Sequence, residues 1–355
     1  MQRRISSHPL SRCALAAAAL FLSAALAASP AADRAHPAAP ATVSPEMAEL
    51  VSAPPAPLWL NTAKDNAEIS AIAKHYAEAA GPQARAFARS MGVEVRERTI
   101  GGVPVFVLST RQTDDRRAGK VVLYLHGGGY ILGHGAAGIT EAVPLAAQGW
   151  RVVCADYRMA PEHPFPAAID DAFAVYRSLV DAVGAENIAV FGSSTGGGMT
   201  LVLALQAIRA GVPTPAALIA GSPWADLSKR GDTYETNAGV DNILTHYEGL
   251  LSSAVKAYAE GEDLSNPLLS PVCAEAGELR QFPPTLLISG TRDLFLSNTV
   301  RMHQRLLTAE APAELIVYEA QSHVQYYLAP SSPESKMHYE LLRRFLERRL
   351  FDAGR

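Results

Sequence analysis

The stretch that decides the fold is FGSSTGGG, residues 191–198. It follows a short apolar run and precedes residues 199–210, which predict a helix. A Gly-x-Ser-x-Gly pattern between a strand and a helix is typical of a nucleophile elbow, a tight turn that exposes the hydroxyl of its central serine. Ser194 is therefore the predicted nucleophile. A phosphate-binding loop or a plain tight turn is the alternative. A phosphate-binding loop requires a lysine after its last glycine, and Met199 stands there.

A second glycine-rich stretch, HGGGY at residues 126–130, directly follows the apolar run at residues 121–125. With no side chains in the way, the backbone N–H groups of such a loop point into a site. Each donor stabilises the oxyanion of a tetrahedral intermediate by about 3–4 kcal/mol. Alone, the pattern also fits a flexible glycine loop. At a strand end and ahead of an elbow, it is typical of the oxyanion loop of lipases and esterases.

Two further residues supply a candidate acid and base. Asp293 and His323 each follow an apolar run that predicts a strand. In open α/β sheets, sites form outside the carboxyl ends of the strands. Ser194, Asp293 and His323 occupy such ends in the chain order nucleophile, acid, base that this elbow has elsewhere. Helix capping is the alternative for Asp293, a surface or capping role is the alternative for His323, and Asp241 and Glu319 are alternative acids.

Short apolar runs recur along the chain from Val93 onward, and helical stretches separate most of them. Strands that are apolar throughout are typical of parallel sheets covered by helices on both faces. The predicted fold class is therefore α/β, with a doubly wound, mostly parallel sheet. The predicted strands are residues 93–99, 103–109, 121–125, 151–155, 188–191, 216–220, 285–289 and 314–318.

Two regions outside this alternation predict a helical cap. Ser44 caps a first helix, Thr62 opens a second helix that Gly81-Pro82 stops, and a third short helix ends near Met91. A later stretch contains several aromatic residues and no clear strand, and we interpret it as an insertion into the cap. The predicted organisation is N-terminal cap helices at residues 45–92 and a core at residues 93–355, with the cap insertion at residues 226–268.

Residues 1–27 have the layout of a secretory signal peptide. Three arginines precede an apolar stretch, residues 14–27, which ends in the small-residue pattern Ala-Leu-Ala. This stretch is shorter than the roughly 20 residues of a membrane span, and an uncleaved anchor is the alternative. Residues 28–44 are rich in alanine and proline and predict a disordered linker. We therefore expect an exported protein, in the periplasm or the medium, with no stable membrane insertion after cleavage.

The composition narrows the function classes. The 355 residues are 48% hydrophobic and 19% charged, with a formal net charge of −4. No basic stripe is present, which argues against a nucleic-acid partner. Cys154 lies in an apolar run, so a free buried thiol is favoured over a disulfide with Cys273. No metal-binding motif occurs, and we expect neither a metal nor a cofactor.

Several motifs together resemble the bacterial hormone-sensitive-lipase-like esterases. Besides the elbow and the HGGG loop, they include DYRMAPEHPFPAA at residues 156–168 and SPWAD at residues 222–226. The similarity runs from Val121 to the C-terminal helix, with a looser match in the N-terminal cap. It implies an α/β-hydrolase fold with a helical cap. It also implies that residues 156–168 brace the active-site loops.

The resemblance assigns roles to individual residues. It implies Ser194 as nucleophile, His323 as base and Asp293 as the orienting acid. The N–H groups of Gly128, Gly129 and Thr195 would form the oxyanion hole. The chain departs from the family pattern in four positions beside these residues: Ser193 replaces the usual Asp, Thr195 the usual Ala, Leu294 the common Pro and Val324 the common Gly.

Together these features predict a carboxylic ester hydrolase that acts on a small-molecule ester through an acyl-enzyme. A lactone hydrolase or deacetylase with the same machinery is the alternative, and a ligand-binding protein on the same fold is the alternative outside enzymes. Tyr130, Leu132 and Trp224 are the predicted walls of the acyl pocket. Because the cap should limit the depth of that pocket, we expect short- to medium-chain acyl esters. A homodimer is compatible with the sequence.

Overall fold

The computed structural model describes residues 36–111 and 117–351. Its centre is one eight-stranded sheet with the strand order β1-β2-β4-β3-β5-β6-β7-β8. The pairings β1–β2 and β2–β4 are antiparallel, and all the others are parallel. The predicted α/β class and mostly parallel sheet are confirmed. The strands are β1 (Glu94–Ile100), β2 (Val103–Ser109), β3 (Val121–Leu125), β4 (Arg151–Ala155), β5 (Ile188–Ser193), β6 (Ala217–Gly221), β7 (Thr285–Gly290) and β8 (Ala313–Tyr318).

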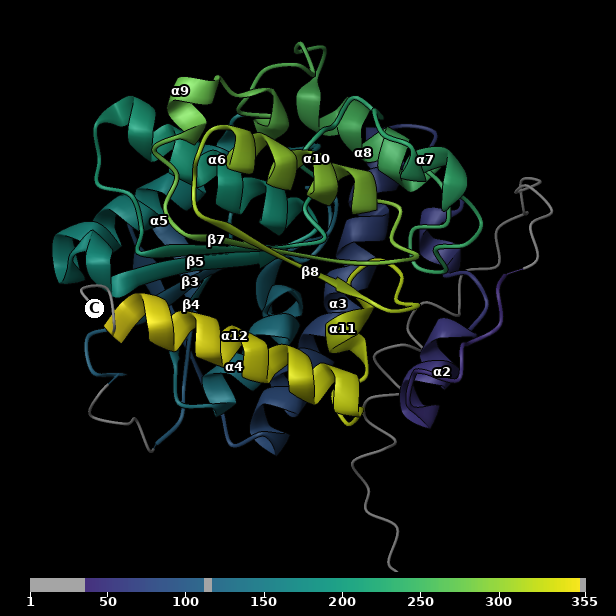
Figure 1. The fold of residues 1–355 in the computed structure, drawn as a ribbon, viewed down its shortest axis with the longest axis horizontal. Coiled ribbons are helices and arrows are strands. Elements are labelled where there is room, and N and C mark those ends of the chain that lie inside the picture. Colours follow the sequence, from purple (N-terminus) through teal and green to yellow (C-terminus); the bar gives the residue numbers. More distant parts are fainter. Residues whose placement is uncertain (1–35, 112–116, 352–355) are drawn as a thin grey trace, which may run out of the picture.

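Helices cover both faces of the sheet, with α5, α6 and α10 on one side and α4 and α12 on the other (Figure 1). Alternate residues of β3 enter the two resulting cores, Leu123 on one face and Val122 on the other. No helix among the described residues is long and apolar enough to cross a bilayer. The helices are α2 (Pro45–Val51), α3 (Asn66–Ser90), α4 (Val143–Ala147), α5 (Ala167–Val183), α6 (Thr195–Ala210), α7 (Thr233–Thr236), α8 (Leu250–Ala259), α9 (Ala276–Leu279), α10 (Leu296–Thr308), α11 (Gln325–Leu328) and α12 (Pro333–Phe351), with short 3-10 helices that include η2 (Pro57–Trp59) and η4 (Gly135–Ala142).

The register of the central strands brings the predicted site together. Leu125, at the end of β3, pairs with Gly192 of β5, so the oxyanion loop and the elbow start side by side. Ser193 pairs with Gly221 of β6. The chain order reverses at β3, which lies between β4 and β5, and such reversal points are where α/β sheets form their crevices.

The N-terminal cap differs from its prediction at α3. The first helix is capped by Ser44 as predicted, but the next begins after Asp65 rather than at Thr62. It also continues through Gly81-Pro82, so one long helix replaces the two predicted ones. The reason is tertiary packing: Gly81 is buried where α3 crosses η4, and this contact outweighs the hydrogen bond that Pro82 cannot donate.

Cap elements from distant parts of the chain gather at one end of the sheet. Figure 1 shows α2, α3, α7 and α8 at the end where α11 also lies. The predicted insertion contributes α7 and α8 and contains no strand, as predicted. Residues 1–27, the predicted signal, lie outside the described residues, as does the first part of the predicted linker. The described part of that linker contacts the core, because Arg292 donates to the carbonyl oxygens of Pro37 (2.9 Å) and Ala38 (2.7 Å).

Candidate active site

The elbow forms where the sequence predicts it, since β5 leads into α6 through Ser194 alone. Ser194 has φ 60° and ψ −126°, a strained conformation for a residue with a side chain. Its N–H donates to Gly221 O (2.8 Å), and its carbonyl accepts from the N–H groups of Gly198 and Trp224 (both 3.0 Å). A Cβ on Gly196 would lie 1.9 Å from a backbone carbonyl oxygen of β3, so only glycine fits there. These contacts hold the serine at the carboxyl end of the sheet.

The glycine loop after β3 passes directly beside the nucleophile. An ideal Cβ on Gly127 would lie 3.0 Å from Ser194 Cβ. The N–H groups of Gly128, Gly129 and Thr195 donate to no acceptor among the described residues. Free backbone donors beside a nucleophile are what an oxyanion hole requires.

The predicted acid and base contact each other. His323 Nδ1 lies 3.0 Å from Asp293 Oδ1, and both side chains are buried. Asp293 also accepts hydrogen bonds from Ser289 Oγ (2.7 Å) and Phe295 N (2.8 Å). Burial alone would raise the pKa of Asp293, but the charge and hydrogen bond of His323 and the bond from Phe295 hold it below its usual range. An ionised Asp293 can therefore fix the imidazole in one orientation.

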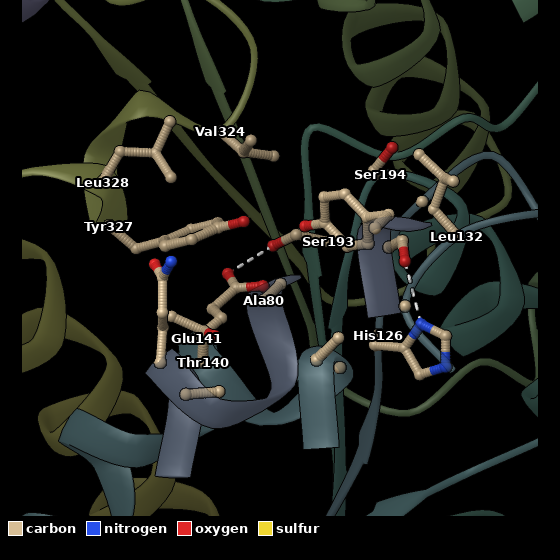
Figure 2. Close-up of a pocket in the computed structure, with 18 of the residues that line it drawn as sticks. Ala80, His126, Leu132, Thr140, Glu141, Ser193, Ser194, Val324, Tyr327 and Leu328 are labelled. Atoms are coloured by element: carbon tan, nitrogen blue, oxygen red, sulfur yellow. Dashed lines mark hydrogen bonds between the residues drawn. The ribbon is translucent and has the colours of Figure 1, made fainter. Parts of the chain in front are cut away.

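Ser194 and His323 line the same cavity, which has a volume of about 270 Å³. Figure 2 shows Ser194 and other residues that line it. His323 Nε2 is buried and has no hydrogen-bond partner among the described residues. The bond between this nitrogen and Ser194 Oγ is thus not formed in this conformation. Catalytic hydrogen bonds are often long until substrate binds, so the arrangement fits a nucleophile and a base in a substrate-free site.

Asp241, one of the alternative acids, has a different contact with the site. Its Oδ2 accepts from the backbone N–H groups of His323 (3.2 Å) and Leu294 (2.8 Å), and not from the imidazole. Its Oδ1 accepts from the N–H groups of Ile243 (2.8 Å) and Leu244 (3.0 Å). Burial and the charge of Asp293 raise the pKa of Asp241 to about 6. Glu319, the other alternative acid, is exposed.

Of the three predicted pocket walls, only Leu132 lines the cavity. Tyr130 is buried outside it and stacks on Tyr258, with ring centroids 3.7 Å apart. Trp224 is also buried outside it, stacked on Phe295 (5.1 Å). Both rings belong to the hydrophobic core, because each stacks on another buried aromatic ring. The cavity is lined instead by side chains that include Trp59 of η2, Tyr76 and Phe87 of α3, and Tyr327 and Leu328 of α11.

Residues 156–168 contact the oxyanion loop, in line with the bracing role that the resemblance implies. Tyr157 stacks on His126, and its hydroxyl donates to His126 O (2.6 Å). Asp156 Oδ1 accepts from Gly135 N (2.8 Å), and Ala160 N donates to Tyr130 O (3.0 Å). The segment therefore contacts the oxyanion loop both at its first residue, His126, and at its last, Tyr130.

Glu141 is a cavity-lining residue that the sequence analysis did not single out. It accepts hydrogen bonds from Ser193 and Tyr124, and it is buried. A signal was present in the sequence, because Glu141 is the one acidic or basic residue, histidine aside, within residues 121–150. A lone acid in so long an apolar stretch indicates a buried polar role.

Within residues 36–111 and 117–351, no group of three or more His, Cys, Asp or Glu side chains is arranged to hold a metal ion. Cys154 is buried, and both it and Cys273 are free thiols, as favoured for Cys154 from its apolar surroundings.

A family model described as the α/β-hydrolase fold matches residues 122–327. The chain belongs to the α/β-hydrolase family. The match begins in β3 and ends in α11, so it includes the elbow, the glycine loop, Asp293 and His323. Fold and family thus agree with the resemblance seen in the motifs.

Named relatives of this α/β-hydrolase are esterases and acetyl-hydrolases. A crystal structure of an esterase superposes with a TM-score of 0.84 and 37% identity, over 92% of this chain and 99% of the other. An esterase of the bacterial hormone-sensitive lipase family superposes with a TM-score of 0.69 and 29% identity, over 81% and 100%. An acetyl-hydrolase from Streptomyces hygroscopicus is 35% identical over 235 residues, which are 65% of this chain and 76% of the relative.

Proposed function

We propose that this α/β-hydrolase cleaves carboxylic esters, with Ser194 as nucleophile, His323 as base and Asp293 as the group that orients the imidazole. The observation that carries the proposal is the 3.0 Å contact between Nδ1 of His323 and Oδ1 of Asp293, made by a histidine that lines the same cavity as Ser194. The esterase and acetyl-hydrolase relatives support ester bonds as the substrate class.

In this mechanism His323 Nε2 takes the proton of Ser194 Oγ while the oxygen attacks the ester carbonyl carbon. The developing oxyanion accepts from the free N–H groups of Gly128, Gly129 and Thr195. Collapse of the intermediate transfers the proton from His323 to the leaving alcohol and leaves an acyl-serine. Water, activated by the same imidazole, then releases the acid and restores Ser194. No cofactor takes part.

The test uses purified protein and p-nitrophenyl butyrate, with Ser194→Ala as the matched variant. We expect turnover by the wild type and near-complete loss in the variant. Labelling with a fluorophosphonate probe, followed by peptide mass spectrometry, should find the probe on Ser194. Turnover that survives in Ser194→Ala would contradict the assignment. Parallel assays with a simple lactone and with an N-acetyl amide separate lactone hydrolysis and deacetylation from ester cleavage.

We also propose that the chain is exported and cleaved after Ala27, on the basis of the N-terminal sequence pattern alone. Mass spectrometry of the exported protein should find a new N-terminus near Ala28, whereas an intact Met1 would count against cleavage. Self-association as a homodimer stays a prediction, which light scattering of the purified protein would test.

A further inference from the structure

One wall of the active-site cavity is acidic. Glu141, at the end of η4, lines this cavity together with Ser193, the residue before the predicted nucleophile, and Tyr124 of β3. Ser193 Oγ donates to Glu141 Oε1 (2.6 Å), as the dashed line in Figure 2 shows. Tyr124 OH donates to Oε2 (2.9 Å). Each carboxylate oxygen thus accepts one hydrogen bond from the protein.

These two bonds leave acceptor capacity unused, because an ionised carboxylate has about four lone-pair sites. No lysine or arginine lines the cavity, and Glu141 takes part in no ion pair of the described residues. Its side chain is 2% exposed. Burial raises the pKa of Glu141 to about 7, against the hydrogen bonds from Ser193 and Tyr124 and the charge of His323. A hydrogen-bond donor that enters the cavity would therefore stabilise the buried carboxylate of Glu141.

The hydroxyl groups around Glu141 direct their protons toward its carboxylate, so its oxygens act as hydrogen-bond acceptors. Tyr326 OH donates to Ser193 Oγ (3.0 Å), which directs the serine proton toward Glu141. A carboxylate at position 193 would instead repel Glu141. Most other residues of the cavity wall are apolar, among them Phe87, Leu132 and Leu328. The cavity therefore combines largely apolar walls and a few neutral polar side chains, among them Gln83 and Thr140, with one acidic acceptor, Glu141.

We propose that Glu141 is a specificity-determining residue that binds a hydrogen-bond donor of the substrate, a hydroxyl or an ammonium group, on the part that occupies this cavity. The preferred esters are thus predicted to carry such a donor in addition to the ester bond. Sites built to pair a substrate hydroxyl or amine discriminate against analogues that lack it, and here such an analogue would leave the remaining acceptor capacity of the buried carboxylate unused. This inference rests on the proposed ester hydrolysis.

The test compares kcat/KM for matched esters in two arms. In the acyl arm, methyl esters of ω-hydroxy and ω-amino acids of three to seven carbons are set against n-alkanoates of equal heavy-atom number. In the alcohol arm, monoacetates of linear diols are set against alkyl acetates. We expect at least one donor-bearing series to exceed its apolar counterpart by about tenfold or more at its best length. The hydroxy and amino series distinguish a neutral donor from a cation.

Glu141→Gln is the diagnostic variant, with exposed Glu262→Gln as the matched control. The first should lower the donor preference about tenfold and leave the apolar esters less affected, while the second should change neither. Equal or better turnover of the apolar esters in both arms, with p-nitrophenyl butyrate still hydrolysed, would overturn the inference and leave the proposed function standing. If the wild type hydrolyses no ester at all, both proposals fail. Because the preference is measured on the wild type, a variant that does not fold leaves the test decisive.

Discussion

The backbone N–H of His323 donates to Oδ2 of Asp241 at 3.2 Å, and the same oxygen accepts from the N–H of Leu294 at 2.8 Å. Leu294 directly follows Asp293. One buried carboxylate from the cap insertion thus joins the loop of the proposed base to the loop of the proposed acid. We therefore infer that Asp241 is a positioning residue, because it accepts from the backbone of the His323 loop and not from the imidazole.

Asp241→Asn should lower kcat by about 100-fold with little change in KM. Four backbone N–H groups donate to the two carboxylate oxygens of Asp241, whereas an amide has only one oxygen that can accept. The loops would separate slightly and misplace His323 relative to Ser194. Steady-state kinetics on p-nitrophenyl butyrate measure both constants. Asp263→Asn, on the exposed surface of the same insertion, serves as control. An unchanged kcat in a folded Asp241→Asn variant would show that the bridge is dispensable.

The three proposed triad residues should behave as one unit. Ser194→Ala and His323→Ala are each expected to lower kcat by about 10⁴- to 10⁶-fold, and Asp293→Asn somewhat less. Glu319→Gln should retain activity, since Glu319 is exposed. The decisive comparison is Asp293→Asn with Glu319→Gln in the same assay. Full activity in the first and loss in the second would show that the acid is misassigned.

Glu141 should also affect the pH dependence of stability. Its folded pKa of about 7 lies above the ordinary value of 4.5, so between these two values the folded state retains a proton that the unfolded state has released. As pH rises from 4.5 to 7, Glu141 therefore lowers the free energy of unfolding of the wild type. The wild type should become less stable relative to Glu141→Gln over this range. Urea unfolding of both proteins at pH 5 and pH 8 measures the difference. A constant difference between the two proteins at both pH values would argue against the raised pKa.

Gly128 of the oxyanion loop and Gly135 of η4 make a pair of glycines for comparison. Gly128 has φ 123°, and a Cβ there would lie 2.2 Å from Leu132 O. Gly135 also has positive φ (68°), but a Cβ there meets nothing within 4 Å. We expect Gly128→Ala to lower kcat by about 100-fold or more through a displaced N–H donor, and Gly135→Ala to retain most activity. Similar losses in both variants, with thermal unfolding unchanged, would refute the proposed role of Gly128.

Sequence reasoning succeeded where the physics is local. Short apolar runs separated by helical stretches located the strands, and the elbow around Ser194 needs only the space that its glycines leave. It failed where distant segments decide the outcome. Gly81-Pro82 reads as a helix stop, yet packing on η4 carries α3 through it. Trp224 follows a strand end, but only the fold shows that Phe295 covers it. Glu141 joins the cavity through a pairing with Ser193, 52 positions away, that no local pattern encodes.

The remaining prediction concerns the length of the acyl chain. The walls of the cavity of about 270 Å³ include Phe87 of α3, in the cap, and Leu328 of α11. Each methylene buried against such walls contributes about 0.8 kcal/mol, or roughly fourfold in kcat/KM, until the chain meets a wall or the carboxyl of Glu141. Activity on p-nitrophenyl esters should therefore rise from acetyl to butyryl or hexanoyl and then fall.

Phe87→Ala should move this optimum to longer chains, because it removes a wall without touching Ser194, His323 or the oxyanion loop. Arg89→Ala, on the exposed face of the same helix, is the matched control and should leave the optimum in place. The measurement is kcat/KM across the ester series, below the micelle concentration of each substrate. A steady rise through palmitoyl in the wild type would show that the cap does not limit the cavity. An optimum unmoved by Phe87→Ala would place the limiting wall elsewhere, at α11 or at Glu141.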